Sequence, residues 1–446
     1  MTQPRSLLLG VAGIALILFL VGLAAGNQPL WQAALVTAAV SFAIGLGGVA
    51  TLTGYQFTAW IIAAVCAAMC YPKHFLYIGP LDLGVLQVPT IDLRNKWVIL
   101  VIVQLVMFGM GTKMSLHDFA GVAKMPYPVF IGTALQFLIM PLTGYALIKV
   151  FNFTPEIAAG VILIGSCSSG LASNVMCYLA GADLALSVTL TAVGTLLSPL
   201  LTPFWIYMLA GESVEMKFVP MMIEIIRIVL LPIGAALLHD ILLRSSLPVR
   251  RLIFSIAMAC LLYLIFLAAG GWGRLAGILP QPILETSVML AAGFLVGVSF
   301  HLLAIRLPWI ERKVHVLSMF GIIYFTAVTT AAGRDNLLHV GIALLVASML
   351  HNLIGWVLGY WLSVLAGLDR SKAITVGFEV AMQNGGMASG LAGVMEKLGT
   401  VGLASAVFSP WMNVSGSIIA NLIRRYAPIE DDKQESPTPQ VYESTM

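Results

Sequence analysis

Charged residues are scarce in this chain of 446 residues: Asp, Glu, Lys and Arg make up 10% of it, whereas 59% is hydrophobic. Ordinary soluble domains carry about 25% charged residues and about 45–50% apolar residues. The shortage of charge therefore excludes a water-soluble fold. The apolar runs also lack the polar and apolar alternation of β-barrel strands, so helices are the remaining way to satisfy the backbone in lipid.

Cysteine is scarce too, and all five cysteines fall within apolar runs. This placement indicates apolar packing and not a disulfide framework or a metal site. The chain also lacks the catalytic sets of intramembrane enzymes, such as paired aspartates, a Gly-x-Ser-x-Gly with a histidine, or a zinc-binding histidine cluster. We therefore expect no enzymatic activity, no cofactor and no nucleic-acid partner.

Apolar runs long enough to cross a bilayer recur along the chain; a hydrocarbon core of ~30 Å takes about 20 helical residues. They predict an all-α polytopic membrane protein with about fourteen passes. The predicted passes are 7–26, 30–52, 54–71, 97–111, 128–150, 155–180, 184–209, 218–243, 252–270, 286–305, 314–332, 337–366, 373–395 and 401–423.

Lys and Arg are unevenly divided between the two sides of this topology. If the chain starts inside, fourteen of the 23 basic residues lie on the inner side and eight on the outer side, with Arg227 inside a span. Because cytoplasmic loops carry the excess of Lys and Arg, we predict a multi-pass protein of the cell (inner) membrane with both termini cytoplasmic. Residues 426–446 are polar and indicate a disordered cytoplasmic tail.

Two segments about 216 positions apart resemble each other, because 169–174 can be aligned with 385–390 and the register holds through their flanks. An odd number of passes separates them, so they face opposite ways, as in inverted-repeat transporters. Small or polar residues interrupt each unit at its middle. We therefore predict that the spans 155–180 and 373–395 are discontinuous helices.

Exposed backbone at this depth is tolerated only where it lines an enclosed cavity or binds something. Unwound carbonyls suit a cation, and the free N–H groups at the start of the following half-helix suit an anion. The candidate anion-binding residues lie at the two predicted helix starts: Ser169, Gly170, Leu171, Asn384 and Gly385. These features predict a secondary transporter that carries a small organic anion together with sodium.

Glu379 is the most telling side chain, because a carboxylate in the centre of a span needs a partner and its own span contains no Lys or Arg. A bound cation is the natural partner. One carboxylate among neutral oxygens suits a monovalent ion better than Ca²⁺, so sodium is predicted. The neutral oxygens come from Ser173, Asn174, Ser187, Thr191 and Gln136. Two alternatives stay open: the hydroxyls could bond only to neighbouring helices, and Glu379 could carry a proton.

Other polar residues in the spans favour structural roles. Glu224 and Arg227 are spaced i, i+3 on one helix face and predict a local ion pair. His239 lies near a membrane boundary, where it looks interfacial. His301 and Gln104 stand alone in their apolar runs and are assigned to packing.

The repeated segments resemble the bile acid:sodium symporter family. GSCSSGLASNVMCYLAGADLALSVTLTAVGTLLSPLLTP over 165–203 is similar to the first crossover region of that family, and EVAMQNGGMASGLAG over 379–393 with FSPWMNVSG over 408–416 is similar to the second. The resemblance implies a ten-helix fold with a panel domain and a core domain that contains two crossed broken helices.

The resemblance also implies two sodium sites. It places the first among Ser173, Asn174, Ser187, Thr191 and Glu379. It places the second at Gln136 with the backbone or side chains of Glu379, Val380, Met382 and Gln383. Departures from the family pattern concern the substrate side: Leu171 replaces a threonine, Met412 a histidine and Ala381 a glycine. The identity of the anion is therefore left open.

Four spans are additions to the ten-helix pattern, and they set the predicted divisions of the chain. These are a two-helix extension at 1–53, the first part of the transporter at 54–243, an inserted two-helix hairpin at 244–313, the rest of the second repeat at 314–425 and the tail at 426–446. The leading hypothesis is sodium-coupled symport of an organic anion across the lipid bilayer. The rival hypothesis is a cation/proton antiporter in which Glu379 titrates.

Overall fold

The computed structural model describes residues 5, 7–49, 55–79, 81–82, 87–88, 90–210 and 217–427. The tail predicted at 426–446 lies almost wholly outside these residues. The elements are, in chain order, α1 (Leu7–Ala24), α2 (Gln28–Leu46), α3 (Gln56–Cys70), α4 (Pro72–Leu76), β1 (Tyr77–Ile78), β2 (Leu81–Asp82), β3 (Gln87–Val88), β4 (Ile91–Asp92), α5 (Lys96–Gly111), α6 (Leu116–Lys124), α7 (Pro126–Phe151), α8 (Pro155–Ser166), α9 (Leu171–Ala180), α10 (Leu184–Ala210), α11 (Phe218–Ile225), η3 (Ile226–Leu230), α12 (Leu231–Arg244), α13 (Leu247–Phe266), η4 (Leu267–Gly271), α14 (Trp272–Ala276), α15 (Gln281–Arg306), α16 (Pro308–Lys313), α17 (His315–Ala332), α18 (Arg334–Leu365), α19 (Arg370–Ala381), α20 (Gly385–Val394) and α21 (Gly402–Tyr426).

The predicted fold class, an all-α polytopic membrane protein, is confirmed. Within the described residues, nine helices are long and apolar enough to cross a membrane, and the bent pair of α5 and α6, with 58° between its members, would add a tenth. The other predicted passes correspond to shorter or divided helices, so the count of fourteen passes stays a prediction. Two small antiparallel ribbons, β1 with β4 and β2 with β3, were not predicted from the sequence.

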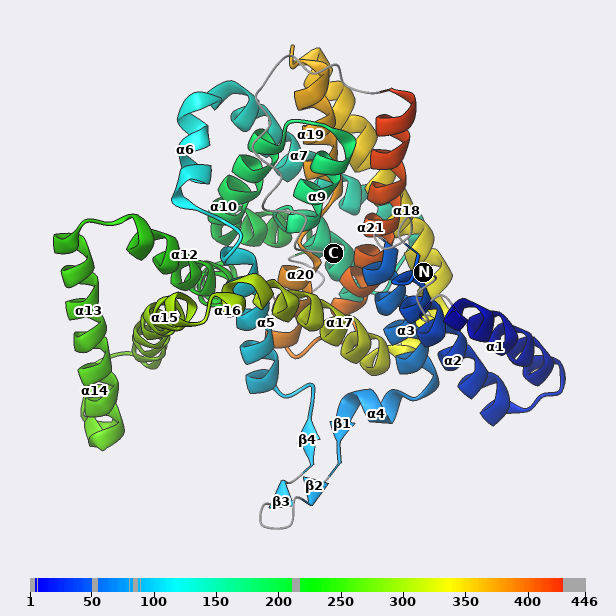
Figure 1. Cartoon of the computed structure of the whole chain (residues 1–446), viewed down its shortest axis with the longest axis horizontal. Coiled ribbons are helices and arrows are strands. Elements are labelled where there is room, and N and C mark those ends of the chain that lie inside the picture. The colour runs from blue at the N-terminus through cyan, green and yellow to red at the C-terminus, as the bar shows by residue number, and fades with distance from the viewer. Residues whose placement is uncertain are drawn as a thin grey trace.

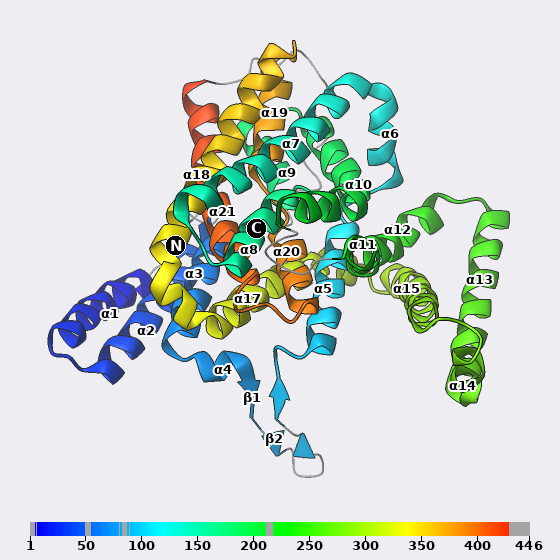
Figure 2. The same cartoon turned by 180° about the vertical axis from the view of Figure 1, so that it is seen from behind.

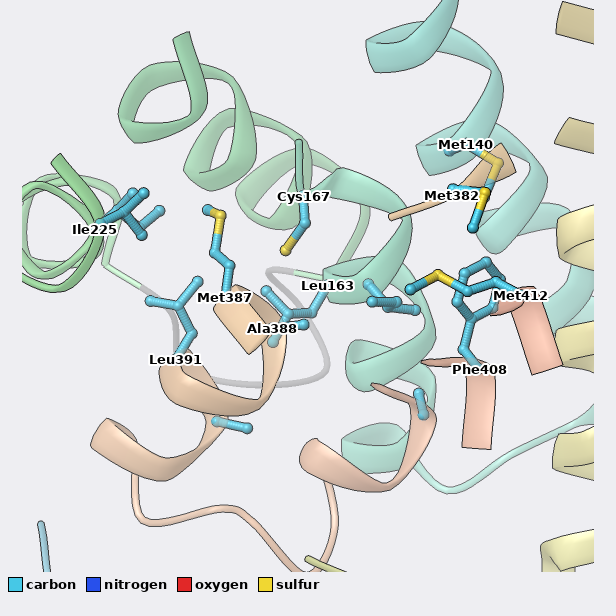
Figure 3. Close-up of a cluster of buried hydrophobic side chains, with 14 of the residues drawn as sticks. Met140, Leu163, Cys167, Ile225, Met382, Met387, Ala388, Leu391, Phe408 and Met412 are labelled. Carbon is cyan, nitrogen blue, oxygen red and sulfur yellow. The ribbon is translucent and has the colours of Figure 1, made fainter. Parts of the chain in front are cut away.

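The helices of the two similar segments pack around one large apolar core. In this core α18 lies against α7 and α19, and α21 lies against α8 and α9. Figure 3 shows part of it, where Met140 and Met382 lie close together and Phe408 and Met412 lie beside them. All four side chains are at least 95% buried. The unbranched methionine side chains fill the irregular space around the helix interruptions.

One glycine brings α8 against the loop that precedes α21. A Cβ atom on Gly160 would lie 2.2 Å from the backbone carbonyl oxygen of Val401. Since no side chain fits at that distance, Gly160 is the residue that permits this close approach between parts of the two repeats.

Two helix pairs extend from opposite ends of the molecule, as Figure 1 shows for α1–α2 and α13–α14. The view from behind in Figure 2 shows the same arrangement. The α1 helix packs on α2 and α2 on α3, while α13 packs on α15 and α15 on α12. The added spans therefore lie around the edge of the fold and leave the helix interruptions inside it.

The ion pair predicted between Glu224 and Arg227 is confirmed, with 3.0 Å between Oε1 and Nη1. The Arg227 guanidinium also donates to the Thr286 hydroxyl of α15 at 2.7 Å, and Glu285 Oε2 lies 3.7 Å from it. Gln104, which the sequence assigns to packing, also bonds to a neighbouring helix, because its amide donates to the Arg227 carbonyl at 3.4 Å. That carbonyl belongs to the π-helical turn η3, whose wider hydrogen-bond spacing makes it an unusual segment of the helix.

Candidate functional site

The helix interruptions of the two repeats meet each other. The chain leaves helical geometry between α8 and α9 and again between α19 and α20. The Asn384 amide donates to the Ser168 carbonyl at 2.7 Å, and the Gly170 amide donates to the Met382 carbonyl at 3.3 Å. Ser169 and Gln383 lie opposite each other as an antiparallel bridge. Backbone groups that the helices leave unpaired are thus satisfied by the other repeat.

Glu379 lies at the last turns of α19, is fully buried and is surrounded by oxygen atoms. Its Oε1 accepts from the Ser187 hydroxyl at 2.6 Å, and its Oε2 accepts from the Ser169 hydroxyl at 2.5 Å and the Thr191 hydroxyl at 3.0 Å. Ser187 and Thr191 lie one turn apart on α10 and also contact Asn174 Oδ1, at 2.7 and 3.2 Å. We call Glu379, Ser169, Asn174, Ser187 and Thr191 the oxygen cluster.

The oxygen cluster gathers hydrogen-bonding oxygens around one buried carboxylate. Ser187 Oγ lies within 2.7 Å of both Glu379 Oε1 and Asn174 Oδ1, and its single proton can go to only one of them. The Thr191 oxygen also lies near both groups. If the Asn174 amide is turned over, its NH2 group donates to these hydroxyls; in the orientation shown, its oxygen is available to a cation.

The structure places the predicted ligand residues unequally. Asn174, Ser187 and Thr191 surround Glu379. The Ser173 hydroxyl donates to the Gly170 carbonyl at 2.7 Å and also lies close enough to interact with the Glu379 carboxylate. Ser169, which the sequence assigned to the anion side, instead donates to Glu379. The sequence signal that could have suggested this is the position of Ser169 inside the first interruption, among the polar residues 165–170.

The residues of the second implied ion site are all buried, and one described hydrogen bond joins two of them. The Gln383 amide donates to the Val380 carbonyl at 2.6 Å, which leaves its Oε1 without a described partner. Neither amide atom of Gln136 has a described partner. A Cβ on Gly194 would lie 3.5 Å from Gln136 Oε1 and from the Ser168 side chain, so this amide lies against α10 beside the first interruption. The Met382 carbonyl is already paired with Gly170.

The remaining candidate anion-binding residues lie at two helix starts. Gly170 and Leu171 begin α9, and Asn384 and Gly385 begin α20. Asn384 Oδ1 accepts from the Met387 amide at 3.0 Å and caps α20, whereas its buried Nδ2 donates to no described group. A Cβ on Gly385 would lie 1.8 Å from Ser409 Oγ, so a larger residue would have to displace that hydroxyl. Free backbone N–H groups and an unpaired amide donor are suited to an anionic ligand.

The chain is similar to known sodium-dependent transporters. The model of the sodium bile acid symporter family matches residues 100–276, which runs past the predicted start of the inserted hairpin at 244. An uncharacterized sodium-dependent transporter of Bacillus subtilis (strain 168) is 28% identical over 371 residues, covering 82% of this chain and 90% of the relative. A probable chloroplastic sodium/metabolite cotransporter of Arabidopsis thaliana is 25% identical over 373 residues, covering 83% of this chain and 74% of the relative.

A shorter match reaches higher identity. The ileal sodium/bile acid cotransporter of Oryctolagus cuniculus is 39% identical over 110 residues, covering 25% of this chain and 32% of the relative. The family and these relatives are transporters and not enzymes. The resemblance found in the sequence is thereby confirmed.

Proposed function

Because the chain is similar to the sodium bile acid symporter family and its sodium-dependent relatives, we propose that it is a sodium-coupled symporter of a small organic anion that works by alternating access. The observation that carries the proposal is the oxygen cluster: Glu379 is a fully buried carboxylate whose described partners are neutral hydroxyl groups, with no positive charge among them. A monovalent cation with several oxygen ligands completes such a site. Sodium would be bound by Glu379, Asn174, Ser187, Thr191 and Ser169.

Sodium binding prepares the anion site through the contact between the interruptions. Ser169 belongs to the oxygen cluster, and its neighbours Ser168 and Gly170 make the backbone hydrogen bonds to Asn384 and Met382. A cation that draws Ser169 and Glu379 together therefore orders the starts of α9 and α20. Their N–H groups then face the organic anion, so anion affinity rises when sodium is bound.

We further propose that the transport step is a rocking motion between two groups of helices. The core is formed by α7–α10 and α18–α21, and the panel by α3, α5, α11–α12 and α17, which contact one another. The panel meets the core where α5 and α17 lie against α20. This division follows the proposed segments 54–243 and 314–425, with 1–53 and 244–313 added at the edge. The proposed location is the inner membrane, with both termini cytoplasmic.

The rival function, cation/proton antiport through Glu379, has the same observation in its favour, because a proton on the carboxylate would also neutralise its buried charge. The two functions differ in what they require of an anion. Symport needs the helix starts at Leu171 and Gly385 to bind a substrate, whereas antiport needs only competition between sodium and protons at Glu379.

The test is a thermal-shift screen of the purified protein with small organic anions, each in NaCl and in KCl. A ligand that binds only the native state raises its stability according to its concentration relative to Kd. We expect one class of carboxylate to raise the unfolding temperature in NaCl and not in KCl. If no anion acts and sodium and protons instead compete, the antiporter assignment replaces symport.

Replacing Ser169 by alanine distinguishes the cation role of this residue from an anion role. Removing a hydroxyl that bonds to a charged group costs about 1.5–3 kcal/mol, so we expect the sodium concentration for half-maximal uptake to rise by about 10-fold or more. At saturating sodium, the KM for the anion should stay close to that of the wild type.

The matched control is Ser198→Ala, because the Ser198 hydroxyl bonds only to the Thr195 carbonyl of its own helix. Ser198→Ala should leave both the sodium concentration for half-maximal uptake and the KM for the anion nearly unchanged. A Ser169→Ala protein with normal sodium dependence and a raised KM for the anion would move Ser169 back to the anion site.

A further inference from the structure

One asparagine of the uninterrupted helix α18 reaches the end of the interrupted helix α19. Asn352 is 3% exposed, and its Nδ2 donates to the Ala381 carbonyl at 2.9 Å. Its Oδ1 accepts from the Ser415 hydroxyl of α21 at 2.6 Å, whereas that hydroxyl lies 3.2 Å from the Met412 carbonyl of its own helix. A carbonyl oxygen only accepts hydrogen bonds, so the amide nitrogen must face Ala381 and the orientation of the Asn352 side chain is fixed.

The Ala381 carbonyl needs a partner from elsewhere in the fold. Ala381 is the last residue of α19, and the final carbonyls of a helix have no partner within it. The carbonyls on either side, of Val380 and Met382, accept from groups of the two interruptions themselves. Asn352 is therefore the group that ties this end of α19 to a continuous helix.

Two glycines of α18 bring it close enough for this contact. Helix α18 lies alongside α19 (Figure 1). A Cβ on Gly355 would lie 3.3 Å from Ala381 Cα, and a Cβ on Gly359 would lie 3.0 Å from Val380 Cβ. The two backbones thus approach each other directly beside the last turn of α19, where the short side chain of Asn352 reaches the carbonyl.

The neighbouring residue His351 holds α18 against the first repeat. His351 is 1% exposed, and its Nε2 lies 2.8 Å from the Met140 carbonyl of α7, so this nitrogen carries the hydrogen. A Cβ on Gly165, in the last turn of α8, would lie 2.9 Å from His351 Cε1. One turn of α18 therefore contacts the last turns of both α8 and α19, the helices that lead into the two interruptions.

We propose that Asn352 is a positioning residue for the sodium site, because it holds the end of α19 where Glu379 meets the ligands of α10. Glu379 lies two residues before Ala381 and accepts from Ser187 and Thr191 of α10. Asn352 makes no described hydrogen bond to the oxygen cluster, so it acts through α19 and not on the ion. The inference rests on the proposed sodium site, and it predicts that sodium binds more weakly when the Ala381 carbonyl is released.

The experiment measures the unfolding temperature of the full-length protein in detergent as NaCl replaces KCl at constant total salt, which gives a Kd for sodium. Asn352→Leu keeps the approximate volume of the side chain but removes its donor and its acceptor. We expect this variant to be less stable than the wild type in KCl and to bind sodium about 3- to 10-fold more weakly. Ser415→Ala keeps the bond to Ala381 and loses only the group that orients the amide, so its Kd should rise by about 2- to 3-fold.

The effects of the two variants should not add. Since Ser415 acts through Asn352, Ser415→Ala should leave the sodium Kd of Asn352→Leu unchanged. If Asn352→Leu does not fold, the comparison of Ser415→Ala with Ser363→Ala decides, because the buried Ser363 hydroxyl of α18 donates to the Gly359 carbonyl of its own helix. Equal Kd values for these two serine variants would overturn the positioning role.

The matched control for the asparagine is Asn336→Leu. Asn336 lies on the same helix and donates to the Gly399 carbonyl at 2.9 Å, outside both interruptions. This variant should lower the unfolding temperature and leave the sodium Kd at the wild-type value. Equal Kd values for Asn352→Leu and Asn336→Leu would mean that Asn352 only supports the fold, which overturns the proposal. A wild type that sodium does not stabilise would overturn the ion site itself, and the positioning role with it, so the two failures are distinguishable.

Discussion

Replacing Glu379 by glutamine is expected to remove sodium-dependent uptake and the stabilisation of the protein by sodium. The change keeps the shape of the side chain but removes the only charge of the oxygen cluster. Loss of a bond to a charged group costs about 1.5–3 kcal/mol, which weakens sodium binding by about 10- to 100-fold. Uptake of the anion identified in the screen should fall accordingly, measured in vesicles with an inward sodium gradient.

The same variant should fold at least as well as the wild type when sodium is absent. Without sodium the buried charge of Glu379 has no counter-charge, which is costly, and a neutral amide costs less to bury, so the unfolding temperature of Glu379→Gln in KCl should be equal or higher. The matched control is Glu156→Gln at the start of α8, which loses a partly exposed ion pair with Lys397 at 2.7 Å. Such pairs contribute about 0–1 kcal/mol. Full sodium-dependent uptake by Glu379→Gln would exclude the proposed ion site.

Replacing Gly160 by alanine is expected to destabilise the fold strongly. The added Cβ would meet the backbone carbonyl of Val401 at 2.2 Å, and backbone atoms cannot move aside as the end of a side chain can. Overpacking of this kind costs about 1–3 kcal/mol. The unfolding temperature in detergent should fall, and the yield of folded protein should fall with it.

Gly234→Ala is the matched control, because Gly234 is also inside a helix but a Cβ there would meet nothing within 4 Å. Alanine favours a helix by up to about 1 kcal/mol over glycine, so this variant should be as stable as the wild type or more stable. Equal stability of the two variants would mean that the approach of α8 to residue 401 is looser than described.

Much of this architecture could be predicted from the sequence because membrane helices are encoded locally. The apolar length of a segment decides whether it can cross the bilayer, and small or polar residues in mid-span mark an interruption. The positions of Ser187 and Thr191 one turn apart, together with the isolated charge of Glu379, were enough to predict that these residues face a common site. All three lie in the oxygen cluster.

The features missed by the sequence depend on contacts between helices that are far apart in the chain. Nothing local relates His301 to His239, which is 62 positions away on another helix. The direction of the Ser169 hydroxyl depends on how closely the two interruptions approach each other, and apolar helices constrain that distance only through packing. The ribbons between α4 and α5 were missed because strands of two residues carry no readable alternation.

The backbone pairing between the two interruptions also determines when folding of this protein can be completed during synthesis. Residues 168 and 170 find their partners at 384 and 382, which leave the ribosome only after most of the chain has been inserted. Until then, unpaired N–H and C=O groups remain in the first repeat at a depth where each costs several kcal/mol. A nascent chain that stops before α19 is therefore an unstable intermediate, and the second repeat acts as the folding partner on which the first one depends.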